Sequence, residues 1–303
     1  MTSLMHILVC VKQTPDSSSV YVDPITGQVD YERFVQVLNP ADACAIEAAV
    51  RLKEQLGSDT VVTALTVGPV DADGALRAAL AIGADSAIRL WQPGAEDWEP
   101  TTVASALASY ISYERTPAPD LILCGDAAID WASGIVGPAL AELLKLPQIT
   151  GVTQLELLQP DTKNLPRLRV VRKLERGYRE ILEAQPPLLI TVTSDLNEPR
   201  YPSLPAHMAA LRASIPVLDP AALNPSFVSE TAGETHILET HIPRPRPKRI
   251  IAPNSHHSAF KRIGEIVSGG ATGRQTRLFE GTPEELAQVL VNFLQDKGFL
   301  SES

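Results

Sequence analysis

The sequence lacks the features that mark several common protein classes. Its three cysteines, Cys10, Cys44 and Cys124, are widely spaced in apolar surroundings, which favours buried reduced thiols over disulfides or a zinc site. No apolar run approaches the roughly 20 residues needed to cross a membrane. The short apolar stretch Met5–Val11 has neither a basic segment before it nor a cleavage pattern after it, so a secretory signal is not expected. We therefore expect a globular, cytoplasmic chain.

Positive charge and catalytic motifs are also scarce. A net charge of −10 at pH 7 argues against a nucleic-acid surface, because phosphate contacts need clustered Lys and Arg. The chain has neither a G-x-x-x-x-G-K-[ST] loop nor a G-x-G-x-x-G fingerprint, and no Ser-His-Asp order, paired catalytic carboxylates or zinc-ligand spacing. His256 and His257 are adjacent, so their side chains diverge. We expect no metal site and no catalysis by this chain alone.

What the first half does contain is a regular alternation of apolar strands and helices. Helices are expected from Pro40 to Leu56, around Ala75–Ile82 and over Thr101–Tyr113. The predicted strands between them are His6–Val11, Val61–Val67, Ser86–Trp91 and Leu121–Cys124. This order predicts an α/β fold with a mostly parallel, doubly wound, Rossmann-like sheet and helices on both faces. Ligands bind beyond the carboxyl ends of such strands, here near residues 10–12, 67–69 and 125–134.

The second half contains short strand-like stretches with little room for helices between them. Short strand-like stretches predict an antiparallel extension of the sheet; they are Val152–Leu158, Arg167–Leu174, Arg179–Ala184 and Leu188–Val192. A hairpin is expected within residues 20–31. We divide the chain into a nucleotide-binding α/β domain (1–218), an extended or flexible arm (219–275) and a terminal strand and helix (276–303). The Gly-rich stretch 268–273 is interpreted as a linker.

The terminal helix has clear start and face signals. Thr282-Pro283-Glu284-Glu285 is a capping box with proline in the first turn. Leu286, Val289, Leu290 and Phe293 then follow at helical spacing and predict an apolar face that docks on a partner.

The stretch Leu121–Pro138 organises the chain. A buried strand ends at Gly125, small residues follow, and an apolar helical pattern begins. This order points backbone N–H groups and a helix N-terminus at one place, which suits a phosphate. The alternative is an ordinary turn between strand and helix, with Gly125 making the bend and Asp130 capping the helix.

Several ordered stretches resemble the β subunits of electron transfer flavoproteins, from about residue 5 to residue 218. They are Ile7–Gln13, Leu38–Pro40, Arg77–Asp85, Gly125–Pro138 and Leu196–Tyr201. The resemblance implies a sheet like that of adenine nucleotide hydrolases and a heterodimer whose α subunit holds the redox FAD. It implies electron transfer from acyl-CoA or related dehydrogenases to a further acceptor, such as a membrane-bound quinone oxidoreductase, without substrate chemistry in this chain.

The resemblance also implies two sets of site residues. A dehydrogenase would dock on Leu196, Asn197, Glu198, Pro199, Arg200 and Tyr201, with Leu196 pointing outward. An adenine nucleotide, either a structural AMP or a second FAD in the electron-bifurcating branch, would lie against a larger set. These residues are Cys10, Asn39, Pro40, Ala41, Asp42, Val67, Gly125, Asp126, Ala127, Ala128, Ile129, Asp130, Trp131, Ala132, Ser133, Gly134, Ile135 and Val136.

The chain departs from the family in the loop itself. Trp131, Ala132, Gly134 and Ile135 stand where relatives usually have acidic, amide or hydroxyl residues, and Ser17 stands where many have a tyrosine near the flavin. An altered or empty nucleotide site therefore stays open.

Other interpretations also remain at this point. Asn39 is a natural cap for a helix beginning at Pro40, and residues 196–201 also suit a packed connection. A stand-alone adenine-nucleotide module or an ATP pyrophosphatase-like enzyme is an alternative function. That alternative needs a phosphate loop after the first strand, which Gln13–Asp16 does not supply.

Overall fold

The computed structural model describes residues 5–21, 23, 34–113, 118–158, 166–223, 257–267 and 281–296. The chain divides into two units, residues 1–243 and 244–303, and each is described by itself. The predicted hairpin at residues 20–31 falls almost entirely outside the described residues, as do the linker at 268–273 and the strand expected just after residue 276.

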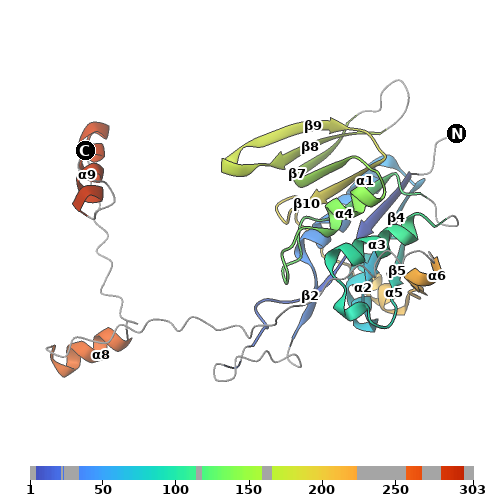
Figure 1. Ribbon diagram of the computed structural model, residues 1–303, viewed down its shortest axis with the longest axis horizontal. Coiled ribbons are helices and arrows are strands. Elements are labelled where there is room, and N and C mark those ends of the chain that lie inside the picture. The colour runs from blue at the N-terminus through green and yellow to red at the C-terminus, as the bar shows by residue number, and fades with distance from the viewer. Residues whose placement is uncertain are drawn as a thin grey trace. The chain divides into compact units, whose positions relative to one another are not determined.

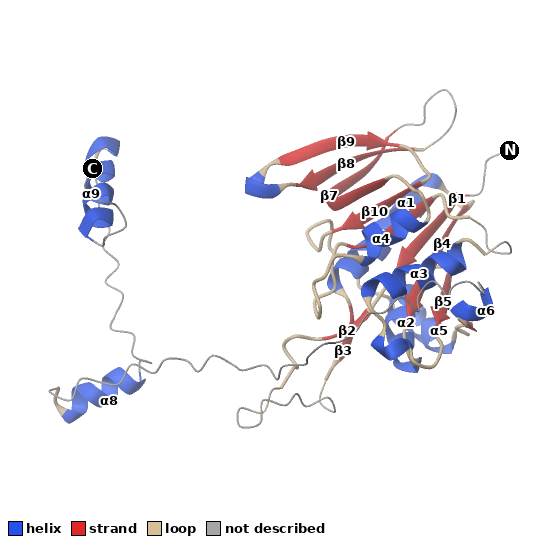
Figure 2. Ribbon diagram, in the orientation of Figure 1, coloured by secondary structure: helices blue, strands red, loops and turns tan. Residues whose placement is uncertain are grey.

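The first unit is built on a nine-stranded sheet with the order β11-β5-β4-β1-β6-β10-β7-β8-β9. Figure 2 draws the strands in red. All neighbours from β11 to β7 are parallel, and only β7-β8 and β8-β9 are antiparallel. The strands are β1 (Met5–Cys10), β4 (Thr60–Val67), β5 (Ser86–Leu90), β6 (Leu121–Gly125), β7 (Gln148–Leu158), β8 (Arg167–Lys173), β9 (Arg179–Ala184), β10 (Leu188–Val192) and β11 (Val217–Leu218). The predicted parallel sheet with an antiparallel extension is confirmed.

One strand differs from the sequence prediction. Leu188–Val192 was expected in the antiparallel extension, but β10 lies between β6 and β7 and runs parallel to both. All five of its residues are buried, which is typical of a central parallel strand covered on both faces. The prediction assumed that strands joined by a short connection are neighbours, but β10 follows β9 in the chain and does not pair with it.

Helices cover both faces of the sheet (Figure 1). Ile7 and Val9 of β1 pack with α1 (Pro40–Leu56) and α2 (Asp73–Ile82), whereas Leu8 and Cys10 pack with α3 (Pro100–Ile111) and α4 (Val136–Leu143). Each fully buried aliphatic side chain of this kind stabilises the fold by roughly 1.5–3 kcal/mol. The two faces of β1 therefore pack against the two helical layers, one on each side of the sheet.

Smaller elements complete the first unit. β2 (Gln13–Pro15) and β3 (Gln36–Leu38) form a separate antiparallel pair beyond β1. α5 (Leu204–Arg212) and α6 (Pro220–Leu223) flank the last strand, β11. All three cysteines are free and buried, as the sequence predicts. None of the helices in the described ranges is long and apolar enough to cross a membrane.

The second unit contains two helices, α8 (Ala259–Val267) and α9 (Pro283–Asp296). The capping box of α9 is present, because Thr282 N donates to Glu285 Oε2 at 2.9 Å and Glu285 N donates to Thr282 Oγ1 at 3.4 Å. The helix α8 was not predicted, since it lies within residues 219–275, which were expected to form an extended or flexible arm. Its signal is the pair Phe260 and Ile263, three residues apart within a Ser- and Gly-rich stretch.

Candidate nucleotide site

A cavity of about 420 Å³ lies at the carboxyl ends of β1, β4, β5 and β6. One wall is the loop from β6 to α4, and the opposite wall is the segment from β5 to α3. The predicted site residues that line it are Cys10, Asn39, Asp42, Val67, Gly125, Asp126, Ala127, Ala128, Trp131, Ser133, Gly134, Ile135 and Val136. The sequence therefore located the cavity from its strand ends.

Asn39 holds the loop that follows β6. Its Nδ2 donates to Ala127 O at 3.1 Å, and its Oδ1 accepts from Ile129 N at 3.2 Å. The side chain is fully buried and makes no capping hydrogen bond to α1. The alternative of a helix cap is therefore wrong, because both ends of the amide are used by the loop.

Asp42 joins the ends of two neighbouring strands. Its carboxylate accepts from Lys12 N, after β1, and from Gly125 N, at the end of β6, both at 2.8 Å. Burial raises the pKa of Asp42 to about 7, against the opposing effect of these hydrogen bonds and of Asn39. The first turn of α1 is thereby fixed against the floor of the cavity.

Gly125 is required by this close approach of α1. A Cβ at this position would collide with Asp42 Oδ1 and lie 2.9 Å from Ala41 Cβ. Packing against α1 is thus a further reason for the glycine, which also lines the cavity.

Asp130 ties the loop to the end of β1. Its Oδ2 lies 2.6 Å from Lys12 Nζ, and its Oδ1 accepts from Trp131 N at 2.8 Å. No helix begins at Trp131, since α4 starts only at Val136. The expected helix cap at Asp130 is therefore wrong, and the side chain instead stabilises a turn.

The remaining loop leaves a run of backbone donors. Within the described part of the chain, the N–H groups of Ser133, Gly134, Ile135, Val136 and Gly137 have no hydrogen-bond acceptor. Gly134 has a φ of +63°, a conformation that favours glycine. Five consecutive N–H groups at a helix N-terminus form a site suited to a phosphate.

Sequence comparison decides the family. Residues 27–223 match the electron transfer flavoprotein domain family, which is more than half of the 303 residues and includes α1 and the whole β6–α4 loop. The chain belongs to the electron transfer flavoproteins.

The chain is similar to several electron transfer flavoprotein β subunits and to a subunit of a reductase-Etf complex. The chain is 40% identical over 200 residues to the electron transfer flavoprotein subunit beta of Thermoanaerobacterium thermosaccharolyticum, which covers 66% of this chain and 72% of the relative. The corresponding subunit of Megasphaera elsdenii is 40% identical over 223 residues, 72% and 80% of the two chains. The CarD subunit of the caffeyl-CoA reductase-Etf complex of Acetobacterium woodii is 36% identical over 244 residues, 79% and 88%. The resemblance to β subunits is confirmed.

Some residues that the flavoprotein resemblance suggested do not line the cavity. Pro40, Ala41, Ile129, Asp130 and Ala132 are absent from its walls, although Ala41 and Asp130 shape the residues that line it. Within the residues that the structure describes, no cluster of three or more His, Cys, Asp and Glu is suited to a metal ion.

Sequence reasoning missed the wall contributed by the end of β5. The additional lining residues there are Trp91, Ala95, Glu96, Trp98, Pro100, Val103 and Leu107. The rule that ligands lie beyond strand ends applied equally to Ser86–Trp91, and it would have found this wall.

The proposed docking loop of the flavoprotein is fastened to α1. Leu196 is half-buried and packs against the hydrophobic core, so the expectation that it points outward is wrong. Asn197 Nδ2 donates to Cys44 O at 3.0 Å, and Arg200 binds Glu47 and Glu54 of the same helix. Tyr201, in contrast, is 99% exposed, and Glu198 and Pro199 beside it are exposed as well.

Proposed function

We propose that this chain is the β subunit of a heterodimeric electron transfer flavoprotein, in which the α partner holds the redox FAD. The observation that carries the proposal is the family match, because it spans α1 and the β6–α4 loop that build the cavity. Electrons would pass from a dehydrogenase through the partner's FAD to a further acceptor. This chain would supply a nucleotide site and docking surfaces.

The nucleotide proposed for the cavity is AMP in a structural role. The backbone donors of residues 133–137 suit a phosphate, and Asn39 and Asp42 hold the start of the same β6–α4 connection through Ala127 O and Gly125 N. Side-chain ligands are few, so the backbone would provide most of the hydrogen bonds, each contributing about 0.5–1.5 kcal/mol.

A second FAD in this cavity is the alternative. The observation that favours it is the similarity to CarD, a subunit of a reductase-Etf complex, and to the acryloyl-CoA reductase electron transfer subunit gamma of Anaerotignum propionicum. On this alternative the chain would take part in electron bifurcation.

Two surfaces would meet other proteins. The loop from Leu196 to Tyr201 would face an acyl-CoA or related dehydrogenase, with Tyr201 as its exposed anchor. The apolar side chains of α9, including Leu290 and Phe293, would pack on the α subunit. A membrane-bound quinone oxidoreductase is the proposed class of acceptor.

The test is co-purification with an electron transfer flavoprotein α subunit from the same organism, followed by an absorption spectrum and nucleotide chromatography after denaturation. One FAD and one AMP per heterodimer support the structural nucleotide, and two FAD support the bifurcating alternative. A complex without flavin, or a flavin complex that no dehydrogenase reduces, would overturn the electron-transfer proposal.

A further inference from the structure

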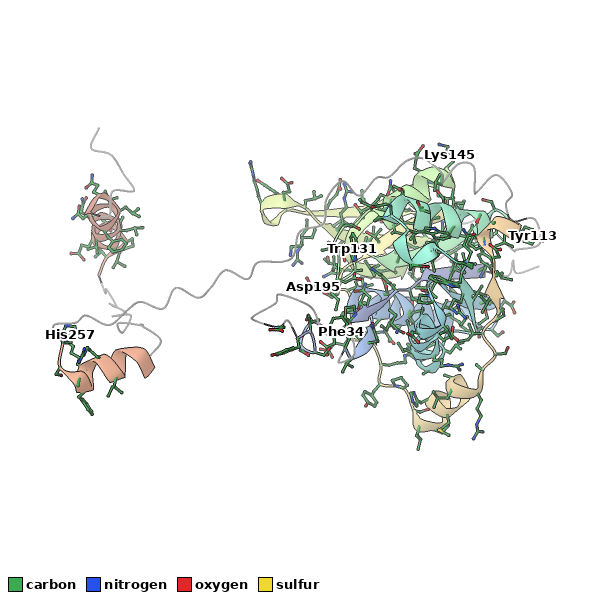
Figure 3. All side chains as sticks on the ribbon, turned by 60° about the horizontal axis from the view of Figure 1, so that its bottom comes forward. Phe34, Tyr113, Trp131, Lys145, Asp195 and His257 are labelled. Atoms are coloured by element: carbon green, nitrogen blue, oxygen red, sulfur yellow. The ribbon has the colours of Figure 1, made fainter. Side chains whose placement is uncertain are left out.

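All three tryptophans of the chain line the same cavity. Trp91 follows β5, Trp98 follows the short helix η3 (Ala95–Asp97), and Trp131 lies on the β6–α4 loop. Trp91 and Trp98 are half-buried, whereas Trp131 is 73% exposed. Trp131 is labelled in Figure 3. We propose that Trp91 and Trp98 seat the base of a nucleotide whose phosphate lies at the N–H groups of residues 133–137. This inference rests on the nucleotide-binding role proposed above and adds the residues that select the base.

The sheet order separates the two ends of this ligand. Between β5, which leads to the tryptophan wall, and β6, which leads to the N–H groups, lie the strands β4 and β1. Strands are spaced by about 4.8 Å, so the ends of β5 and β6 are roughly 14 Å apart. The aromatic wall and the phosphate donors are therefore on opposite sides of the cavity, and one elongated ligand is needed to reach both.

The aromatic side is also the apolar side. Pro100, Val103 and Leu107 of α3 line the cavity next to the two tryptophans. A planar heterocycle buries its faces well against such a wall, since aromatic rings combine large contact area with favourable stacking. Stacking on an aromatic side chain strengthens binding of a base roughly 5- to 150-fold.

The positions of the charged side chains and of the backbone N–H donors indicate which end of the ligand faces which wall. The carboxylates of Asp71 and Glu96 line the cavity on the tryptophan side and are exposed, so an anion there meets like charge. Lys12 lines the cavity on the side of the β6–α4 loop, where its Nζ pairs with Asp130. Asp42 and Asp126 lie on that side too, and burial raises the pKa of both carboxyl groups. The phosphate therefore belongs with the backbone donors and the base with the tryptophans.

Trp131 adds a ring face at the edge of the loop. Its indole stands among Ala132, Gly134 and Ile135, which offer no side-chain hydrogen bonds to a ligand. Aromatic contact would thus compensate for missing polar contacts. The chemistry required is that of an adenosine phosphate, either as free AMP or as the AMP half of FAD.

The experiment is isothermal titration of the purified heterodimer, freed of the nucleotide in this cavity, with AMP, adenosine, ribose 5-phosphate and FAD. Trp91→Leu and Trp98→Leu should each weaken AMP and adenosine roughly 5- to 150-fold and leave ribose 5-phosphate unchanged. Trp98→Phe should retain most of the affinity because it keeps an aromatic face. Tyr178→Leu is the matched control, because Tyr178 is 70% exposed and does not line the cavity.

Several outcomes would overturn the inference. They are unchanged AMP affinity in both leucine variants, an equal loss for ribose 5-phosphate, or a wild-type complex that binds neither AMP nor FAD here. Competition between AMP and FAD shows which of the two nucleotides binds more tightly in this cavity. Dehydrogenase-driven reduction of the α-subunit flavin is measured on the same samples, so a failed base seat with intact reduction leaves the electron-transfer proposal standing.

Discussion

Arg200 of the proposed docking loop donates from Nε to Glu47 Oε2 of α1 at 2.8 Å. The Glu47 side chain is only 2% exposed, and it also accepts from Arg200 N at 3.1 Å and from Arg51 Nε at 2.5 Å. Burial by itself would raise the pKa of Glu47, but the hydrogen bonds from Arg200 and Arg51 lower it below its ordinary value. The loop is therefore held by a buried carboxylate of the same helix whose first turn fixes the nucleotide cavity.

The first prediction concerns this carboxylate. Glu47→Gln should lower the free energy of unfolding by about 1–3 kcal/mol, because an NH2 group would replace one carboxylate oxygen and set a donor against the N–H donors of Arg200 or Arg51. It should also raise the KM for the partner dehydrogenase, since the loop would have to be ordered on docking. Urea unfolding and steady-state flavin reduction measure the two effects.

Glu54→Gln is the matched control for Glu47→Gln. Glu54 binds the same guanidinium but is 55% exposed, and exposed ion pairs contribute at most about 1 kcal/mol. Equal effects of the two substitutions would show that the buried position of Glu47 has no special role.

The second prediction separates the two apolar side chains of the loop. Leu196→Ala should lower stability by about 1–2 kcal/mol, less than the 2–5 kcal/mol of a fully buried leucine, because Leu196 is half-buried against the core. Tyr201→Ala should change stability by less than about 0.5 kcal/mol and slow flavin reduction, since exposed tyrosines are frequent anchors of interfaces. Flavin reduction that is slowed by Leu196→Ala at unchanged stability, with no effect of Tyr201→Ala, would restore Leu196 as the anchor.

The third prediction follows from the raised pKa of Asp42. An unfolded aspartate titrates near 3.8, whereas Asp42 in the folded chain titrates near 7. The folded state therefore binds the proton more tightly, and the stability contributed by this proton is full below about pH 4 and lost as the pH rises to about 7. The unfolding free energy of the wild type minus that of Asp42→Asn should therefore fall by about 3 kcal/mol from pH 4.5 to pH 8, because only the wild type loses this proton. A difference that is constant or grows over this range, in urea unfolding, would contradict the assigned pKa.

The fold was predictable where local patterns agree with the global one. The strand β1 is apolar throughout, and α1 begins at a proline and ends at Gly57, so both appear in the sequence. The place of β10 was not predictable from its own residues, because strand order depends on how the chain crosses the sheet. The capping box of α9 was visible, while α8 was hidden by the surrounding Ser and Gly residues.

The sequence predicted where the site lies in the fold, but not the roles of its individual residues. The end of β6 was found because an apolar strand stops at Gly125, yet the reason for that glycine is Asp42, 83 residues earlier. Asn39 looked like a helix cap because caps are local, whereas its true partners, Ala127 and Ile129, are distant in sequence. Hydrogen bonds between distant segments leave no periodic signal, so the roles of single residues had to come from the structure.

The last prediction concerns α9. Leu290 is 57% exposed and lies on the apolar stripe with Leu286 and Phe293, and a stripe of this kind on a capped helix is typical of an interface. We expect deletion of residues 276–303 to weaken association with the α subunit, and Leu290→Glu to do so by about tenfold or more, because a charge in an apolar contact is costly. Asn292→Glu is the control, because Asn292 Oδ1 accepts from Gln288 Nε2 at 3.0 Å on the polar side of the helix. Analytical ultracentrifugation measures the association. If Leu290→Glu and the deletion leave the dissociation constant unchanged, α9 does not hold the α subunit.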